Sequence, residues 1–247
     1  PRPQRSPGEV LVRLRAATVN RVDLYMRDSG AGITHTLPMT MGLDGAGVVE
    51  ELDADERSLQ LGQRVVVHPG IACGRCEFCL RGDDVLCTSM SLLGEHRDGT
   101  FAEFVSLPAR NVFPLPESYD DVQAAALGVN HLTAWRMLFT QARLQAHETV
   151  LVFGIGGGVS LAALQLAKAA GAKVIVTSRD AAKLERAVRM GADAAVHSAS
   201  QDIARTVLEL TGGRGVDVVI ENVGAAVWGA ALTSLGRGGR LGPCGAT

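Results

Sequence analysis

A glycine-rich turn between two apolar runs limits the fold of this chain more than any other feature. Residues 150–153 are apolar and of strand type, and the turn GIGGGVS follows at residues 154–160. Residues 159–170 are rich in Ala and Leu without a helix breaker, Gly171 ends that run, and residues 173–177 are again β-branched. The order strand, glycine turn, helix, strand predicts a βαβ unit that opens on a nucleotide-binding turn.

The residues of this turn are the first candidates for binding a cofactor. Glycines let the backbone bend sharply and bring N–H groups close to a pyrophosphate, and the start of the helix adds its dipole. A glycine-rich connection in some other α/β protein is the alternative, but strands and a helix flank the turn in the right order. We therefore expect the turn to contact a dinucleotide through Gly154, Gly156, Gly157, Gly158 and Val159.

The end of the second strand indicates which dinucleotide binds. No Asp or Glu stands there to hold a ribose 2′-hydroxyl; Ser178 and Arg179 do instead, and they suit a 2′-phosphate. This favours NADP(H) over NAD(H) and argues against an S-adenosylmethionine site. The absence of a G-x-x-x-x-G-K-[ST] segment argues against an ATP-binding P-loop. Lys183 and Asn222 are further candidate cofactor contacts.

Composition sets the broad class. With 247 residues the chain has room for one large or two modest domains, and 47% hydrophobic with 20% charged residues fits a soluble globular protein. The net charge of −2 gives no general attraction to nucleic acid or to anionic membranes. No apolar run approaches the length of a membrane span. We expect a cytoplasmic protein whose partner is a small-molecule substrate.

Four of the five cysteines lie within one short stretch. They are Cys73, Cys76, Cys79 and Cys87, in the pattern C-x2-C-x2-C-x7-C. Four thiolates at this spacing can surround one tetrahedral ion, and a shell of four cysteines is the usual structural zinc site. Reduced cysteines, disulfides and an iron–sulfur cluster are the alternatives. With every position taken by sulfur, the expected zinc holds a lobe together and leaves no place for substrate.

The two halves of the chain differ in pattern. Short strands separated by Gly and Pro predict an irregular β-barrel. Residues 9–16, 99–105 and 107–116 are strand-like, the glycines of residues 38–50 lead into a further strand, and residues 62–67 are a turn that leads into another. The second half predicts a parallel doubly wound sheet. Its strands are expected at 150–153, 173–177, 194–196, 216–221 and 239–243, and its helices at 119–127, 130–139, 159–170, 181–190, 203–210 and 226–235. We place the domains at 1–121 and 122–247.

Several segments together carry a family resemblance. They are GEVLVRLRAATVNRVD, GLDGAGVV, the four-cysteine lobe, GTFAEF, LTAW, the glycine turn and GVDVVIENVG. The chain resembles the medium-chain dehydrogenase/reductase superfamily, with its zinc-type alcohol dehydrogenase-like and quinone oxidoreductase-like branches. The resemblance implies an α/β chain with a GroES-like β-barrel domain followed by a Rossmann sheet. Because family members extend beyond both ends of this sequence, we expect truncation at both ends, and a homodimer or tetramer for the full-length protein.

The resemblance also bears on a second, catalytic zinc. Zinc alcohol dehydrogenases bind it with two cysteines and a histidine, and the matching positions here are Asn20, Leu43 and Val129. Leucine and valine cannot ligate zinc, and none of the six histidines falls at these positions. The chain thus resembles the quinone oxidoreductase-like and enoyl reductase-like branches, as does the pattern N-x-x-D-x-Y formed with Asp23 and Tyr25.

These observations lead to an expected reaction. Without a Lewis acid a simple ketone is hard to polarise, whereas a quinone or an α,β-unsaturated carbonyl is already electrophilic. We therefore expect hydride transfer from NADPH to such a substrate. Asn20 and Tyr25 are the candidate catalytic residues; the alternatives are a helix-capping asparagine and an ordinary half-buried tyrosine. Asp23 and Asp44 are interpreted as structural carboxylates.

Three further residues are assigned by resemblance. Asn130 and Thr133 are expected to touch the nicotinamide ribose or the phosphates, with helix capping as the alternative, and Cys244 is expected to lie along the nicotinamide ring. His131 is interpreted as structural. Two other functions stay open: a zinc-dependent alcohol dehydrogenase with unrecognised ligands, and a dinucleotide-binding protein without catalytic activity.

Overall fold

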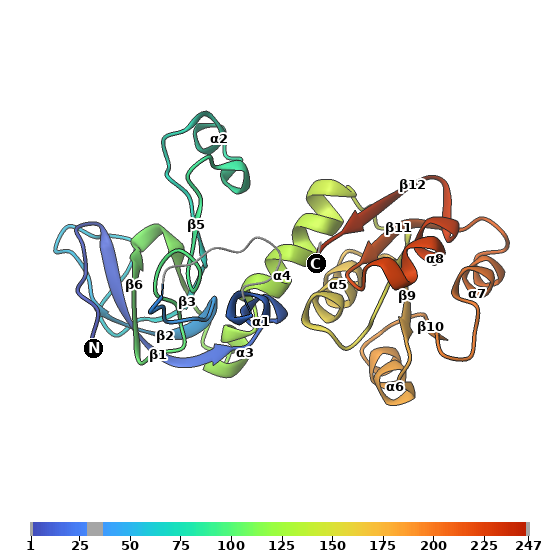
Figure 1. The fold of residues 1–247 in the computed structure, drawn as a ribbon, viewed down its shortest axis with the longest axis horizontal. Coiled ribbons are helices and arrows are strands. Elements are labelled where there is room, and N and C mark those ends of the chain that lie inside the picture. Colours follow the sequence, from blue (N-terminus) through green and yellow to red (C-terminus); the bar gives the residue numbers. More distant parts are fainter. Residues whose placement is uncertain (1, 29–36, 246–247) are drawn as a thin grey trace. The chain divides into compact units, whose positions relative to one another are not determined.

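The computed structural model describes residues 2–28 and 37–245. The chain divides into two compact units, Pro1–Val129 and Asn130–Thr247, and the division falls within one helix, α4 (Gly128–Trp135). Figure 1 traces the chain through both units. Each unit is described separately.

The first unit is built on an antiparallel five-stranded sheet, in the part of the chain for which the sequence predicts an irregular β-barrel. Its order is β6-β1-β2-β3-β7. The strands are β1 (Glu9–Thr18), β2 (Asp44–Glu51), β3 (Arg64–Val67), β6 (Phe104–Pro108) and β7 (Val112–Pro114). Alternate residues of β1 point inward, so Val10 and Val12 join Val65 and Leu107 in one apolar core.

The expected strand at residues 99–105 begins later than predicted. Residues 99–103 are outside any strand, and β6 starts at Phe104. The N–H groups of Thr100 and Phe101 donate to the carbonyls of Gly42 and Met41 instead of to a neighbouring strand. A Cβ on Gly99 would lie 2.1 Å from the Gly42 oxygen. The main chain at Gly99 therefore packs against the main chain at Gly42 more closely than any residue with a side chain could.

A lobe leaves the first unit through a small hairpin. β4 (Gly70–Ile71) pairs with β5 (Ser91–Leu92), and α2 (Glu77–Leu80) and the 3₁₀ turn η1 (Asp84–Leu86) lie between them. In Figure 1 the lobe projects from the sheet with α2 at its far end.

Short helices complete the first unit. α1 (Arg21–Arg27) begins after Asn20, and α3 (Asp121–Ala125) is capped by Asp120, whose carboxylate accepts a hydrogen bond from Gln123 N at 2.7 Å. One more 3₁₀ turn, η2 (Ala109–Asn111), joins β6 to β7. Of these helices α3 was predicted, at residues 119–127, and it is shorter than expected at both ends.

The second unit is a parallel five-stranded sheet with helices on both faces. Its order is β10-β9-β8-β11-β12. The strands are β8 (Thr149–Val152), β9 (Lys173–Ser178), β10 (Ala194–His197), β11 (Val216–Glu221) and β12 (Leu235–Pro243). Val150 and Val152 pack into the core on the α5 side, whereas Leu151 joins the core under α7 and α8. This confirms the predicted doubly wound sheet.

The helices of the second unit are α5 (Gly158–Ala169), α6 (Ala181–Arg189), α7 (Ile203–Leu210) and α8 (Trp228–Thr233). α4 continues into a π-helical segment, η3 (Arg136–Gln141). None of the helices in the described ranges is long and apolar enough to cross a membrane.

The last predicted helix, at 226–235, is shorter than expected. The 3₁₀ turn η4 (Ala225–Val227) comes first, α8 ends at Thr233, and Leu235 already belongs to β12. Leu235 pairs with Val216, and the register then shifts before Arg240 pairs with Val218. Pairing with β11 therefore extends β12 to Leu235, four residues before the predicted start of the strand at residue 239.

Candidate functional site

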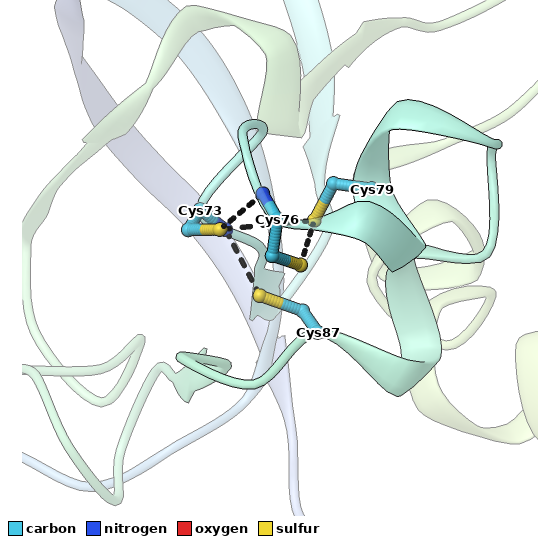
Figure 2. Close-up of side chains that lie close together, drawn as sticks. All are labelled: Cys73, Cys76, Cys79 and Cys87. Carbon is cyan, nitrogen blue, oxygen red and sulfur yellow. Dashed lines mark hydrogen bonds between the residues drawn. The ribbon is translucent and has the colours of Figure 1, made fainter.

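The four clustered cysteines meet at one point of the lobe. Figure 2 shows their side chains converging, and all four sulfur atoms lie within 4.8 Å of one another. The Cys76 and Cys79 sulfurs are 3.4 Å apart, and those of Cys73 and Cys79 are 3.9 Å apart. A tetrahedral zinc with Zn–S bonds of about 2.3 Å separates its sulfurs by about 3.8 Å. The donor set and its spacing therefore fit one zinc ion.

The electrostatics of the cluster also call for a cation. Backbone N–H groups, led by that of Cys79, lower the pKa of Cys76 to about 6, while burial raises the pKa of Cys79 to about 12. Four thiolates this close together repel one another, so only a bound cation allows all four to lose their protons. All four cysteines are free of disulfides.

The lobe is shaped for this convergence by its backbone. Gly74 has a φ of +72°, where glycine is favoured, and a Cβ there would lie 2.4 Å from the Arg110 guanidinium. Arg110 in turn donates to the carbonyl of Ala72. Backbone N–H groups of Cys73 and Ser89 donate to the Cys87 sulfur at 3.2 and 3.4 Å.

The glycine turn of the second unit has the conformation that the motif predicts. Gly154 and Gly156 have φ values of +64° and +108°, and Gly157 precedes the first turn of α5. Ser160 is completely buried, and its hydroxyl lies 2.8 Å from the Gly154 carbonyl and 3.0 Å from that of Gly157. Serine therefore fills the third glycine position and satisfies the carbonyls of the turn.

Side chains from three elements gather around this turn. A Cβ on Gly158 would lie 2.4 Å from the Asn130 amide, and one on Gly156 would lie 2.6 Å from Lys183 Cδ. Asn222 Oδ1 lies 3.5 Å from the Cβ position of Gly154. Candidates from α4, α6 and the end of β11 thus lie against the glycines, whose lack of a side chain makes room for them beside the helix start.

The structure places the other cofactor candidates at nearby strand and helix positions. Ser178 ends β9, where its hydroxyl accepts a hydrogen bond from Asp180 N at 3.1 Å. Arg179 follows and is exposed. Thr133 lies on α4, and Val159 packs in the first turn of α5.

Cys244 follows β12, and its N–H donates to the Glu221 carbonyl at 2.9 Å. Burial raises the pKa of this thiol, and the charge of Glu221 adds to the effect. Cys244 is therefore held in the thiol form, beside the carboxyl end of β11.

In the first unit, Asn20 and Asp44 form a buried pair. Asn20 Nδ2 donates to Asp44 Oδ2 at 2.8 Å, and the Thr18 hydroxyl lies 3.3 Å from the same oxygen. The other oxygen, Oδ1, accepts from Val129 N at 2.8 Å. Asp44 has no exposed surface, and burial raises its pKa despite these hydrogen bonds.

Asn20 also forms a capping box with Asp23 at the start of α1, where Asn20 N donates to Asp23 Oδ2 at 2.6 Å. Burial raises the pKa of Asp23, and Asp44 adds to this. Within the described ranges, Asp23 Oδ1 has no hydrogen-bond partner. Tyr25 is half-buried on the same helix.

The three positions matched to a catalytic zinc therefore meet around Asp44. Asn20 and Val129 both donate to its carboxylate, and Leu43 precedes it in the chain. Across residues 2–28 and 37–245, the four cysteines are the one group of three or more His, Cys, Asp or Glu side chains close enough to hold an ion.

Sequence reasoning did not foresee the central place of Asp44 or the role of Gly128. A Cβ on Gly128 would lie 2.0 Å from Asp44 Oδ1, so glycine is required for this contact. The sequence held one indication of both residues: Asp44 directly follows Leu43 and Gly128 directly precedes Val129, and Leu43 and Val129 are positions matched to a catalytic zinc.

Comparisons with known proteins agree with this picture. Residues 6–117 match the family described as "Alcohol dehydrogenase GroES-like domain", and residues 158–247 match "Zinc-binding dehydrogenase". An alcohol dehydrogenase of Geobacillus stearothermophilus is 34% identical over 96% of this chain and 70% of its own length. An NAD-dependent alcohol dehydrogenase of Sulfurisphaera tokodaii is 33% identical over 90% of this chain and 66% of its own length.

Solved structures show the same relationship. A crystal structure of an NAD-dependent alcohol dehydrogenase gives a TM-score of 0.94 at 41% identity, over 98% of this chain and 70% of that one. A cobalt- and zinc-bound alcohol dehydrogenase from Pyrobaculum aerophilum gives 0.85 at 33% identity, over 99% and 70%.

These matches confirm the GroES-like domain followed by the Rossmann sheet, and they support a dinucleotide cofactor and zinc. Because the family matches and several relatives exceed 30% identity, the chain belongs to the medium-chain dehydrogenase/reductase superfamily, in its zinc-type alcohol dehydrogenase-like group, and is an NAD(P)-dependent oxidoreductase.

Proposed function

We propose that this oxidoreductase transfers a hydride from NADPH to a quinone or to the β-carbon of an α,β-unsaturated carbonyl, without a catalytic metal ion. The observation that carries the proposal is the environment of Asp44. The positions that resemble a catalytic zinc site hold an amide and two hydrocarbon side chains, in Asn20, Leu43 and Val129. Hydrogen bonds to Asn20, Thr18 and Val129 already engage both carboxylate oxygens.

The remaining chemistry follows from residues of this chain. A bound nicotinamide dinucleotide supplies the hydride. N–H groups at the start of α5, next to Gly154, Gly156 and Gly157, would hold its pyrophosphate. Asn20 and Tyr25 would donate hydrogen bonds to the oxygen on which negative charge develops. Such donors are sufficient for an electrophilic enone or quinone, whereas a simple ketone needs stronger polarisation.

The proposed preference for NADPH depends on Ser178, Arg179 and Lys183. The two cations lie after β9 and on α6, and neither forms an ion pair within the described part of the chain. A 2′-phosphate would provide their counter-charge. Two relatives are named NAD-dependent, which supports the opposite preference for those proteins.

We also propose one zinc ion bound by Cys73, Cys76, Cys79 and Cys87. The sulfur spacing of the lobe supports this assignment, and the family description "Zinc-binding dehydrogenase" agrees with it. Because four sulfurs complete the coordination shell, the role of this ion is structural.

An alcohol dehydrogenase is the second candidate function, since the names of the relatives favour it. Two measurements separate the candidates: the zinc content per chain, and turnover of NADPH against a panel of quinones, enones and simple ketones, with and without a chelator. The proposal predicts one zinc and quinone or enone reduction that survives brief chelation. Two zinc ions, with alcohol oxidation that the chelator abolishes, would establish the alternative. Tight NADPH binding with no turnover would indicate a binding protein.

A further inference from the structure

The Asp44 carboxylate orients every group that donates to it. Asp44 accepts the hydrogen bonds from Asn20, Thr18 and Val129, so the Asn20 amide presents its nitrogen, and not its oxygen, to Asp44. The main chain of Asn20 is held as well, since its N–H donates to Asp23 Oδ2 at 2.6 Å. With 7% of its surface exposed, Asn20 is too enclosed to turn freely. The amide is therefore held in one of its two orientations.

The same carboxylate begins α4. Val129 is the second residue of that helix, and its N–H is one of the first-turn groups that have no partner within a helix. Asp44 Oδ1 accepts this N–H, as an N-cap side chain does, although Asp44 is distant in sequence. A negative charge at this end also complements the helix dipole. Gly128 leaves the room for this contact.

We propose that Asp44 is a positioning residue that fixes the amide orientation of Asn20 and at the same time anchors the start of α4, the helix that carries Asn130 and Thr133. Its hydrogen bonds connect Asn20 and Val129, two of the three positions matched to a catalytic zinc, and the third, Leu43, is its neighbour in the chain. The inference rests on the proposed function only in that Asn20 contacts the substrate or the nicotinamide; the geometric part stands without it.

Asp44→Asn is the informative change because it preserves size and changes only the pattern of donors. The new carbonyl oxygen keeps the Val129 N–H, so the new NH2 group turns towards Asn20. Two amide nitrogens then face each other, and Asn20 must turn its oxygen inward. This reverses the donor and acceptor that Asn20 presents elsewhere. Because the substitution also removes a buried charge, we expect the variant to fold.

The matched control is Thr100→Val. The Thr100 hydroxyl donates to the Asp44 main-chain oxygen at 2.8 Å, and the side chain is 1% exposed. Its loss weakens the same strand end and leaves the carboxylate with all of its donors. A purely structural role of this region would make the two variants behave alike.

The experiment measures both variants in the full-length protein purified with its metal. In Asp44→Asn we expect kcat for the best acceptor to fall at least tenfold, with KM for NADPH within threefold of wild type and an unchanged melting profile within a few degrees. In Thr100→Val we expect kcat within threefold. Equal kcat in wild type and Asp44→Asn, or an equal loss in the two variants, overturns the inference.

A second measurement does not need turnover. The side-chain amide signals of Asn20 in a ¹⁵N spectrum are identified by their absence from Asn20→Asp. They should shift strongly in Asp44→Asn and little in Thr100→Val. Absence of turnover in the wild-type protein refutes the proposed function alone, whereas unshifted Asn20 signals in Asp44→Asn refute the positioning role.

Discussion

The side chain of Lys183 lies over Gly156, so that a Cβ on the glycine would fall 2.6 Å from Lys183 Cδ. The two residues lie in different elements, since Gly156 is in the turn before α5 and Lys183 is on α6, the helix that follows the βαβ unit. The contact requires residue 156 to have no side chain. It also places a cation beside the turn at which we propose the pyrophosphate binds.

The first prediction follows from this contact. Gly156→Ala introduces both a clash with Lys183 and a side chain at a φ of +108°. We expect NADPH affinity to fall at least tenfold, with a loss of about 1–3 kcal/mol in stability. Fluorescence titration with NADPH and urea unfolding measure the two effects. Gly213→Ala is the control, because its φ is +82° but nothing lies within 4 Å of the new Cβ. An equal loss of affinity in both variants would contradict the prediction.

The second prediction concerns the choice of dinucleotide. Arg179→Gln removes the cation that follows β9. The KM for NADPH should rise at least tenfold while that for NADH stays nearly constant, because one charge-assisted phosphate contact is worth roughly 1.5–3 kcal/mol. Arg186→Gln, on the same helix as Lys183, serves as the control and should change neither value. If Arg179→Gln raises the KM for NADPH and the KM for NADH equally, Arg179 does not bind the 2′-phosphate.

The third prediction concerns the cysteine lobe. Cys79→Ala should abolish zinc binding and lower stability by several kcal/mol, because the lobe is held together by its metal. Metal analysis and thermal unfolding provide the measurements. Cys244→Ala, a cysteine outside the cluster, should keep the zinc. Full zinc content in Cys79→Ala would show that the metal lies elsewhere.

The fourth prediction uses the pH dependence of stability. A hydrogen-bonded pair with Arg214, together with Thr149 N, lowers the pKa of Asp217 from 3.8 to about 2. Because the folded-state pKa is lowered, the stabilisation is present above about pH 4 and disappears as the pH falls towards 2. Its size is at most about 2 kcal/mol, since one pKa unit corresponds to about 1.4 kcal/mol and solvent screens the pair with the exposed Arg214.

Asp217→Asn should therefore lower stability at pH 7 by about 1–2 kcal/mol and flatten the loss of stability below pH 4. Urea unfolding at a series of pH values gives both quantities. Asp55→Asn changes an exposed carboxylate and should leave the curve unaltered. A pH profile of Asp217→Asn parallel to that of wild type would show that this carboxylate carries none of the acid sensitivity.

The fifth prediction compares two glycines in helices. Gly128→Ala places a Cβ 2.0 Å from Asp44 Oδ1 and should destabilise the protein by about 2 kcal/mol or more through overpacking. Gly229→Ala, in α8, has open space around the new Cβ and should stabilise by about 0.5–1 kcal/mol. Both are measured by urea unfolding at neutral pH. Two changes of the same sign would refute the packing argument.

Local signals in the sequence were sufficient for most of the second unit. Strands β8, β9 and β11 are short apolar runs, and Asp180 and Asp202 cap the helices that follow, so element type and order could be read from neighbouring residues. The glycine turn was also local, because the glycines, Val159 and Ser160 are consecutive. The four-cysteine lobe followed from spacing, since thiolates so close in sequence can reach one ion. The roles of the candidate catalytic and cofactor residues stay predictions.

Only the tertiary structure determined the contacts between residues that are far apart in the chain. The late start of β6 depends on Gly99 packing against Gly42, and the early start of β12 depends on Leu235 pairing with Val216. The meeting of Asn20, Asp44 and Val129 is of the same kind: no spacing in the sequence reveals that one buried carboxylate accepts hydrogen bonds from both of the others. The physical reason is that backbone propensity and capping act over a few residues, whereas burial of a charged group forces it to find its donors wherever the fold brings them.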